Sequence, residues 1–258
     1  MYLAILGDIH GGLDTLRKAI SYLANIDLDL ILCTGDYIES FSADVSQSLE
    51  ILFKIFDYLN SLDRVIAYTW GDADLVLFNT ITHSSNVELN HHNLNRILNY
   101  ILNMRKTFEA PRKNRLCLEN RLCITSNPNY VNSKTILLIH YMHTVARNPL
   151  LHIEGHTHYA QIKDNYINAG FIYCKDSNSG KVLNELVIIV ELDEMNYIVK
   201  NVAYRFLDIV LKEYTCFLHR EEGVFIIPKW WKRCPVCMNP LYAKFSNIYQ
   251  GIRLVEQL

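Results

Sequence analysis

The first third of the chain alternates short apolar runs with segments in which hydrophobic residues recur at helical spacing. Residues 2 to 6 are mostly apolar and predict a buried strand, and residues 26 to 33 predict a second one. Between them, apolar positions three and four residues apart predict a helix over residues 13 to 24. A strand, a helix and a strand in this order predict a βαβ unit, whose parallel strands bring their carboxyl ends to one ligand-binding edge.

The same alternation continues to about residue 110. The clearest amphipathic helix lies at residues 45 to 59, with Ser42 as its expected N-cap, and a further strand is expected at residues 64 to 69. Residues 75 to 92 follow no clear period. Residues 94 to 108 predict a long helix, which the proline three residues later ends.

In the second half of the chain the apolar runs follow one another without helical segments between them. This pattern predicts a second, partly antiparallel sheet. It begins with a hairpin at residues 116 to 124, and further strands are expected at residues 134 to 139, 150 to 153, 160 to 163, 166 to 173, 185 to 192 and 197 to 204.

Composition narrows the class of protein but indicates no activity. The 258 residues are 50% hydrophobic and 20% charged, as in an ordinary globular protein, and the formal net charge is −2. That balance gives no general reason to bind nucleic acid or an anionic membrane. No apolar run reaches the roughly 18 residues that span a bilayer, and the N-terminus does not resemble a signal peptide, so we expect a cytoplasmic protein.

The chain has seven cysteines, an odd number, which argues against a fully paired disulfide framework. Cys33, Cys117, Cys123 and Cys174 stand singly in apolar surroundings, and we expect them to be small buried hydrophobic residues. The other three lie close to the C-terminus and follow a metal-ligand spacing.

Acidic residues and histidines directly follow the predicted strands. Asp8 and His10 come after the first strand, and residues two apart on an extended chain point to the same side. Asp36 comes after the second strand, at the same edge of the sheet. On its own, D-x-H at a strand end is more often a turn with a capping Asp, so a metal site requires further ligands. The chain supplies these in G-D-A-D at 71 to 74, His140 and G-H-T-H at 155 to 158.

Taken together, these motifs resemble those of the calcineurin-like metallophosphoesterases. The family's five motifs are D-x-H, G-D, G-N-H-[DE], H and G-H-x-H, in the same order and with similar gaps, and four of them fit fully. The resemblance covers roughly residues 1 to 204. It implies an α/β fold, a two-sheet αββα sandwich flanked by helices, which the order of the predicted strands supports.

The resemblance also implies two adjacent divalent metal ions and a hydrolase activity, in which a metal-bound hydroxide attacks a phosphodiester or phosphomonoester. Asp36 is the implied bridging ligand. Imidazole and carboxylate ligands without thiolate favour Mn, Fe, Zn or Ni over Ca or Mg. The implied ligands of the first ion are Asp8, His10 and His158, and those of the second are Asp72, His140 and His156.

The third motif departs from the family at two positions. Asp72 stands in place of Asn, so three aspartates leave a pair of dications with a charge of +1 rather than +2. Ala73 stands in place of a histidine that lies beside the phosphate and protonates the leaving oxygen or steadies its charge, a contribution of typically 10² to 10⁴-fold. The catalytic acid is therefore unknown. Its candidate substitutes, each more commonly a surface or packing residue, are His143, His83, His91 and His92.

Two functions of different classes remain open. The first is a dinuclear phosphoesterase, weakened by the loss of the usual histidine at Ala73. The second is a catalytically attenuated binding or scaffold module that keeps the fold and engages a partner through the metal surface or the C-terminal segment.

The last segment, residues 213 to 258, carries a second pattern of metal ligands. Cys216-x2-His219 and Cys234-x2-Cys237, separated by fourteen residues, have the spacing of a structural zinc site. We therefore expect a metallophosphoesterase domain over residues 1 to 212 and a zinc-ribbon-like domain over residues 213 to 258, with residues 224 to 227 as a strand of the ribbon. A redox C-x-x-C pair or simple packing cysteines are the alternatives.

Basic and aromatic residues alternate between the two halves of this pattern. Such residues can contact phosphates and stack on the bases of single-stranded nucleic acid. Alternatively the tryptophans dock the segment on the main domain, which its mild net charge favours. The sequence indicates neither the substrate, nor the physiological metal, nor the oligomeric state. The residues concerned are Lys229, Trp230, Trp231, Lys232 and Arg233.

Overall fold

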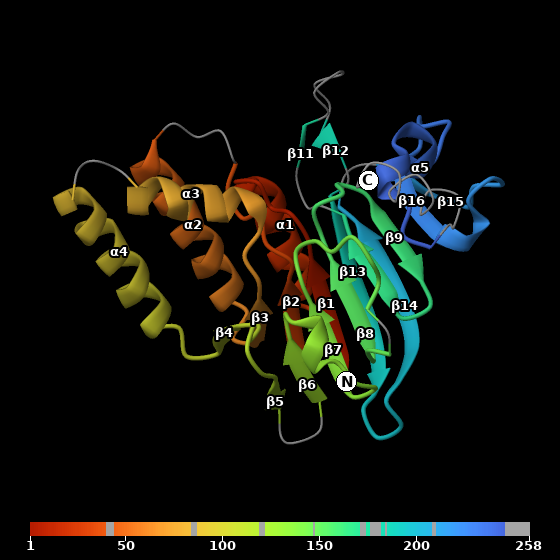
Figure 1. Ribbon diagram of the computed structural model, residues 1–258, viewed down its shortest axis with the longest axis horizontal. Helices are drawn as coiled ribbons and strands as arrows, with labels where there is room; N and C mark the ends of the chain where they lie inside the picture. The colour runs from red at the N-terminus through yellow and green to blue at the C-terminus, as the bar shows by residue number, and fades with distance from the viewer. Residues whose placement is uncertain are drawn as a thin grey trace, which may run out of the picture.

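Two β-sheets lie face to face at the centre of the molecule, and a layer of helices covers the outer face of the first sheet (Figure 1). This arrangement confirms the predicted two-sheet α/β sandwich. The computed structural model describes residues 1–39, 44–83, 87–118, 122–146, 148–170, 174–175, 182–183, 185–207 and 210–245.

The first sheet has six strands in the order β14-β13-β1-β2-β3-β4. Its four neighbouring strands β1 to β4 run parallel, as the repeated βαβ pattern predicts, and β13 and β14 add an antiparallel hairpin beside β1. The strands are β1 (Tyr2–Leu6), β2 (Leu30–Cys33), β3 (Val65–Tyr68), β4 (Thr107–Glu109), β13 (Leu186–Asp193) and β14 (Ile198–Phe206). The helices are α1 (Leu13–Leu23), α2 (Val45–Asn60), α3 (Asp72–His83) and α4 (Val87–Leu102).

The second sheet has eight strands in the order β15-β16-β9-β10-β8-β7-β6-β5. Strands β6, β7, β8 and β10 run parallel, and the outer strands pair antiparallel. Its strands are β5 (Leu116–Leu118), β6 (Leu122–Thr125), β7 (Thr135–Leu138), β8 (Leu151–Glu154), β9 (Ala160–Lys163), β10 (Tyr166–Ala169), β15 (Leu211–Tyr214) and β16 (Val224–Pro228). Short elements complete the described chain: η1 (Pro128–Tyr130), β11 (Cys174–Lys175), β12 (Val182–Leu183), η2 (Arg220–Glu222), α5 (Pro235–Met238) and η3 (Pro240–Tyr242).

The central strands are apolar on both faces because each face meets a different core. In β1, Ala4 and Leu6 pack under the helices, whereas Leu3 and Ile5 pack between the two sheets. This double burial explains why the strands read as nearly continuous apolar runs. It also holds the carboxyl ends of β1, β2 and β3 at one fixed edge.

Two expectations about the elements are wrong. The helix expected over residues 94 to 108 ends at Leu102, and Thr107–Glu109 forms β4, because Phe108 packs between the sheets instead. Residues 75 to 92, which the sequence left unassigned, belong largely to α3 and α4. The predicted strands at residues 185 to 192 and 197 to 204 are β13 and β14 of the first sheet, because β13 pairs with β1.

The N-cap of α2 also differs from the expectation. Asp44 caps this helix, and its Oδ1 accepts hydrogen bonds from the backbone N–H groups of Ser46 and Gln47 at 2.9 and 3.2 Å. Ser42, the expected N-cap, lies outside the described residues.

The four single cysteines were expected to be small buried hydrophobic residues, and this expectation is confirmed only in part. Cys33 is buried and free, as expected. Cys117 and Cys123 instead form a disulfide, because the register of the β5–β6 hairpin places them directly opposite each other. For Cys174 the structure describes the backbone, in β11, but not the side chain.

The C-terminal segment continues the second sheet. Strand β16, at the predicted position, pairs with β15 on one side and with β9 on the other. The division into residues 1 to 212 and 213 to 258 stays a prediction. Within the described part of the chain, no helix has both the length and the apolar character needed to cross a membrane; the expected cytoplasmic location also stays a prediction.

Candidate metal centre

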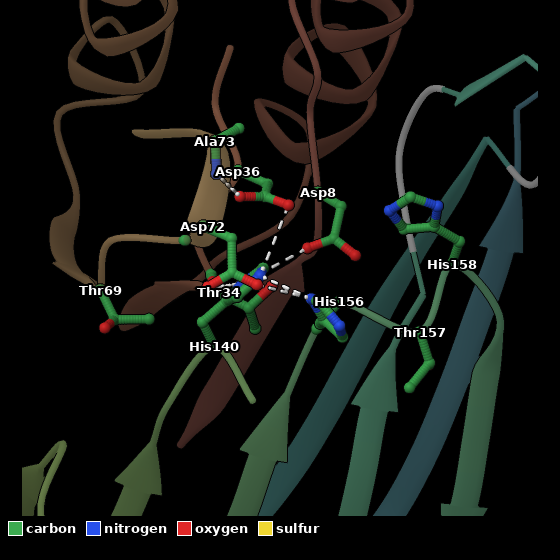
Figure 2. A network of polar contacts seen from close by, with 12 residues as sticks. Asp8, Thr34, Asp36, Thr69, Asp72, Ala73, His140, His156, Thr157 and His158 are labelled. Carbon is green, nitrogen blue, oxygen red and sulfur yellow. Dashed lines mark hydrogen bonds and ion pairs between the residues drawn. The ribbon is translucent and has the colours of Figure 1, made fainter. Parts of the chain in front are cut away.

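The seven predicted metal ligands lie at one edge of the sandwich, where parallel strands of both sheets end, and Figure 2 labels all of them except His10. Those from the first sheet follow β1, β2 and β3, and those from the second follow β7 and β8. The structure thus brings together residues up to 150 positions apart in the sequence, as expected for the carboxyl ends of parallel strands. They are Asp8, His10, Asp36, Asp72, His140, His156 and His158.

Asp36 stands between two groups of potential ligands. It forms one group with His10 and His158 and another with His140 and His156, and within each group one ligand atom per residue lies within 4.8 Å of the others. Asp36 Oδ2 is 3.7 Å from Nε2 of His10 and 3.4 Å from Nε2 of His140. Its other oxygen, Oδ1, accepts the backbone N–H of Ala73 at 2.8 Å, which fixes the carboxylate.

His140 is oriented by the strand beside it. Its Nδ1 lies 2.8 Å from the backbone oxygen of Thr34, which can only accept, so Nδ1 carries the proton and Nε2 faces the cluster. Burial lowers the pKa of this imidazole, but its hydrogen bond to Asp36 and the charges of Asp8 and Asp36 outweigh burial and raise it to about 9. Burial raises the pKa of the Asp36 carboxylate, but His140, the backbone N–H of Ala73 and His10 together outweigh burial and lower this pKa to about 2.

Asp8 is fully buried, and both of its carboxylate oxygens lack a hydrogen-bond partner among the described residues. Burial raises its pKa well above the usual range, although His140, with Nδ1 at 3.8 Å, opposes the shift. An unsatisfied buried carboxylate beside imidazoles is costly, and a cation removes that cost. The donor set around Asp8 and Asp36 therefore fits divalent metal ions.

The rings of His10 and His158 pack edge to face, with their centroids 4.9 Å apart. Their Nε2 atoms are 3.1 Å apart, a distance at which two ligand atoms can share one ion. Burial and the neighbouring His10 lower the pKa of His158 to about 3, so this imidazole is neutral and keeps a lone pair.

Asp72 reaches the cluster from its open side. Its Oδ2 lies 3.2 Å from Nδ1 of His156, which in turn lies 3.3 Å from Nε2 of His140. The Asp72 side chain is 66% exposed, so it is the most accessible carboxylate of the set.

Five of the seven residues adopt a positive φ, a conformation that is uncommon outside glycine and typical of functional sites. Two glycines allow the loops to approach one another. A Cβ on Gly155 would lie 2.5 Å from Oδ1 of Asp8, and one on Gly71 would lie 2.2 Å from Oδ1 of Asp36. The residues with positive φ are Asp8, His10, Asp36, His156 and His158.

Asp74 has a role that the sequence did not indicate. Its buried carboxylate accepts the backbone N–H groups of Gly71 at 3.0 Å and of Tyr37 at 3.0 Å, and that of Ile38 at 3.4 Å. It thereby ties the loop after β2 to the loop after β3. Burial raises its pKa to about 7, although the N–H groups of Gly71 and Tyr37 act in the opposite direction.

The four candidate substitutes for the missing histidine are not equivalent. Ala73 itself is 2% exposed and packs in the core under the helices. His143 is exposed and lies 5.1 Å, ring to ring, from Tyr141, whose ring lies 4.5 Å from that of His156. The other three lie on the helices: His83 ends α3, and His91 and His92 are exposed on α4, at the outer edge of the helix layer (Figure 1).

A cavity of about 320 Å³ adjoins the cluster on the Asp72 side. It follows the same edge of the sandwich past β3, β4 and β6, and its lining includes Asp72, Arg112, Ser126, His140 and Tyr141. A larger cavity, of about 1040 Å³, lies at the amino ends of the strands and contains none of the predicted ligands.

The four residues predicted as zinc ligands converge in the C-terminal segment. Nδ1 of His219 lies 3.5 Å from Sγ of Cys216 and 3.4 Å from Sγ of both Cys234 and Cys237, and the Cys216 and Cys237 sulfurs are 3.7 Å apart. Tetrahedral zinc, with bonds of about 2.3 Å to sulfur and 2.0 Å to nitrogen, requires edges of roughly 3.8 Å (S–S) and 3.5 Å (S–N). The observed distances fit such a site.

In the basic and aromatic residues 229 to 233, one tryptophan is packed and the other is exposed. Trp231 packs against the apolar cluster that contains Cys216 and Cys234. Trp230 is 43% exposed. Three basic residues, Lys229, Lys232 and Arg233, are exposed.

Comparisons with known proteins extend these observations. A family model described as calcineurin-like phosphoesterase matches residues 1–160. Among solved structures, a protein of Thermus thermophilus is 12% identical over 80% of this chain and 98% of that one (TM-score 0.48), and an archaeal phosphodiesterase is 18% identical over 80% and 99% (TM-score 0.43). Another solved chain is 9% identical over 80% of this chain and 99% of that one, with a TM-score of 0.51. This likeness supports the fold alone. No curated sequence matches significantly.

Proposed function

The chain belongs to the calcineurin-like phosphoesterase family, a family of metal-dependent hydrolases, and from this membership we propose that it is a dinuclear phosphoesterase. It hydrolyses a phosphodiester or phosphomonoester. His10 and His158, with the unpartnered carboxylate of Asp8, would hold one ion, and Asp36 would be shared with the second. His140 and His156, with Asp72 beside them, would hold the second ion.

The observation that carries this proposal is the shared position of Asp36, which belongs to both groups of ligand atoms. Two divalent cations at this site would supply a water of lowered pKa as the nucleophile and would neutralise charge on the phosphoryl oxygens. The imidazole and carboxylate donors suit Mn, Fe, Zn or Ni. The chain itself contributes preorganisation: the Ala73 N–H holds Asp36, and the backbone oxygen of Thr34 holds His140.

Turnover is weak toward poor leaving groups, because alanine at position 73 cannot protonate the departing oxygen. The open cavity beside Asp72 and His140 is where the substrate enters. The same alanine, buried in the core, also supports the second candidate function: a binding or scaffold module that keeps the metal pair but lacks turnover.

Metal counting tests this proposal without requiring knowledge of the substrate. Elemental analysis of the protein supplied with manganese is expected to give about two transition-metal ions besides one zinc, and Asp36→Asn is expected to lose the pair and keep the zinc. Asp164→Asn, an exposed aspartate of similar backbone conformation outside the site, is the matched control. Zinc alone in the unaltered protein would refute the dinuclear site. Two bound ions without hydrolysis of an activated phosphodiester would favour the binding module.

We further propose that residues 213 to 258 form a zinc-ribbon-like unit after a domain of residues 1 to 212. The four ligand distances at Cys216, His219, Cys234 and Cys237 support one structural zinc there. The exposed basic residues beside Trp230 support a contact with single-stranded nucleic acid, as part of the substrate or as a separate partner.

A further inference from the structure

A buried lysine near the end of the described chain contacts two loops of the candidate metal centre. The Lys244 side chain is 1% exposed, and its Nζ lies 2.9 Å from Oε2 of Glu154, which is also buried. It also donates to the backbone oxygen of Met142. Lysine is rarely buried unless it is paired, so this contact is a specific feature of the fold.

The two partners of Lys244 lie in the loops that carry metal ligands. Glu154 is the last residue of β8 and comes two positions before His156. Met142 comes two positions after His140. One ammonium group therefore joins the loops on which both histidines of the second ion lie.

Glu154 is itself held in a network. Its Oε1 lies 3.0 Å from Nε2 of His152, and its Oε2 accepts the hydroxyl of Tyr166 at 3.1 Å. Lys244 thus meets a buried carboxylate that two other side chains also contact, which makes the contact rigid.

Lys244 also reaches His156 through an aromatic ring. Its Nζ lies 4.3 Å from the centre of the Tyr141 ring, within cation–π range. The Tyr141 ring packs at 4.5 Å, with a tilt of 37°, against the imidazole of His156. Tyr141 is therefore held on one side by Lys244 and itself limits the rotation of His156.

The position of Lys244 depends in turn on the predicted zinc cluster. The buried carboxylate of Glu222 accepts the backbone N–H of Lys244 at 2.9 and 3.0 Å and that of Phe245 at 3.0 Å. Glu222 ends η2, the turn that begins directly after His219, and its N–H donates to the backbone oxygen of His219 at 3.1 Å. A continuous set of contacts therefore runs from His219 through Glu222 to Lys244.

We propose that Lys244 is a positioning residue for the second metal ion, through which the zinc-bearing segment forms part of the active site. This inference rests on the proposed dinuclear function. Residues that orient metal ligands without touching the metal typically change metal affinity about 10 to 100-fold when removed. Loss of Lys244 is therefore expected to weaken one of the two ions by that factor and to leave the other in place.

Manganese titration of the full chain, with the zinc retained, tests the proposal. Lys244→Met is expected to weaken one of two Mn²⁺ ions about 10 to 100-fold and to speed hydrogen exchange of residues 139 to 146. Lys163→Met is the control, because Lys163 also contacts this segment, at the backbone oxygen of Glu221 and at the ring of Phe245, and neither of these residues lies in the ligand loops. The double variant Glu154→Gln/Lys244→Met removes both buried charges, so it is expected to regain thermal stability while Mn²⁺ binding stays weak.

The outcomes separate the inference from the function on which it rests. Two Mn²⁺ ions bound equally well by the unaltered protein and by Lys244→Met, with unchanged exchange, would overturn the positioning role alone. No Mn²⁺ bound by the unaltered protein would overturn the dinuclear function and this inference with it. Recovery of full Mn²⁺ affinity in the double variant would overturn it as well, because the unpaired charge of Glu154 would then explain the single variant. Cys237→Ser is expected to weaken the same ion, and an unchanged ion there would overturn the link to the zinc cluster.

Discussion

Removing the Asp74 carboxylate gives the sharpest test of how the candidate metal centre is held together. Asp74 lies in the first turn of α3, yet its oxygens accept backbone N–H groups of Gly71, Tyr37 and Ile38, from two different loops. Asp74→Ala leaves these buried donors without an acceptor. Each unsatisfied buried donor costs about 1 to 3 kcal/mol.

Two of the three bonds are 3.0 Å long, and the third, at 3.4 Å, is weak. The free energy of unfolding is therefore expected to fall by the cost of roughly two unsatisfied donors, about 2 to 6 kcal/mol. Urea unfolding of the protein without transition metals, at constant pH, measures this loss. The matched control is Asp72→Ala, in the same turn, whose side chain is 66% exposed and is expected to cost less than about 1 kcal/mol.

The same substitution is also expected to weaken metal binding, because Asp36 lies in one of the loops that Asp74 joins and Asp72 directly follows the other. Equal stability losses in Asp74→Ala and Asp72→Ala, or a loss below about 1 kcal/mol in Asp74→Ala, would refute the role given to these bonds. A destabilised variant that still binds two ions with unchanged affinity would show that the loops hold their geometry without Asp74.

Three further predictions concern metal content, turnover and partner binding. Cys234→Ser is expected to abolish the chelator-resistant zinc, whereas Cys33→Ser, which changes a buried free cysteine elsewhere, is expected to leave it; elemental analysis decides. Ala73→His is expected to raise hydrolysis of an activated phosphodiester at a cost of about 1 to 3 kcal/mol in stability, since the position is buried; unchanged turnover at full metal occupancy would favour the binding module. Trp230→Ala with Trp231→Ala is expected to weaken binding of a single-stranded oligonucleotide, by about 1 to 3 kcal/mol per lost stack, and undiminished binding would contradict nucleic-acid recognition.

The parts of the site that follow from local rules could be predicted from the sequence. Asp8, Asp36 and His140 each come directly after a buried apolar run, and the carboxyl ends of parallel strands meet at one edge. The Lys244–Glu154 pair could not be predicted, because it joins residues 90 positions apart and no periodic pattern marks either of them. The disulfide between Cys117 and Cys123 depends on the register of a hairpin, which the apolar character of its strands does not reveal.

The helix predicted over residues 94 to 108 was wrong at its C-terminal end for a different reason. Apolar positions in residues 94 to 108 continue at a spacing compatible with a helix, but Phe108 is apolar because it packs between the sheets. A short strand of three residues is too brief to establish its own period. Residues 107 to 109 form a strand because they pair in parallel with β3, which lies about 40 positions earlier in the sequence.

The two predicted metal sites depend on their metals to different degrees. Five predicted ligands of the dinuclear site have left-handed backbone conformations, which cost of order 1 to 3 kcal/mol each. Backbone hydrogen bonds between the ligand loops offset this cost without a metal: the N–H of His10 donates to the backbone oxygen of Asp36 at 2.8 Å, and that of Gly155 donates to the backbone oxygen of His140 at 2.9 Å. The two large apolar cores support these loops from below.

The C-terminal cluster has much less support of its own. Its apolar cluster has only six buried members among the described residues, and two of them, Cys216 and Cys234, are themselves predicted zinc ligands. We therefore expect metal binding to contribute folding free energy in this segment, whereas the sandwich preorganises the predicted dinuclear site. Because Glu222 and Lys244 connect the two predicted sites, a zinc in this segment is expected to support the metal pair by holding Lys244 in place, without taking part in the chemistry itself.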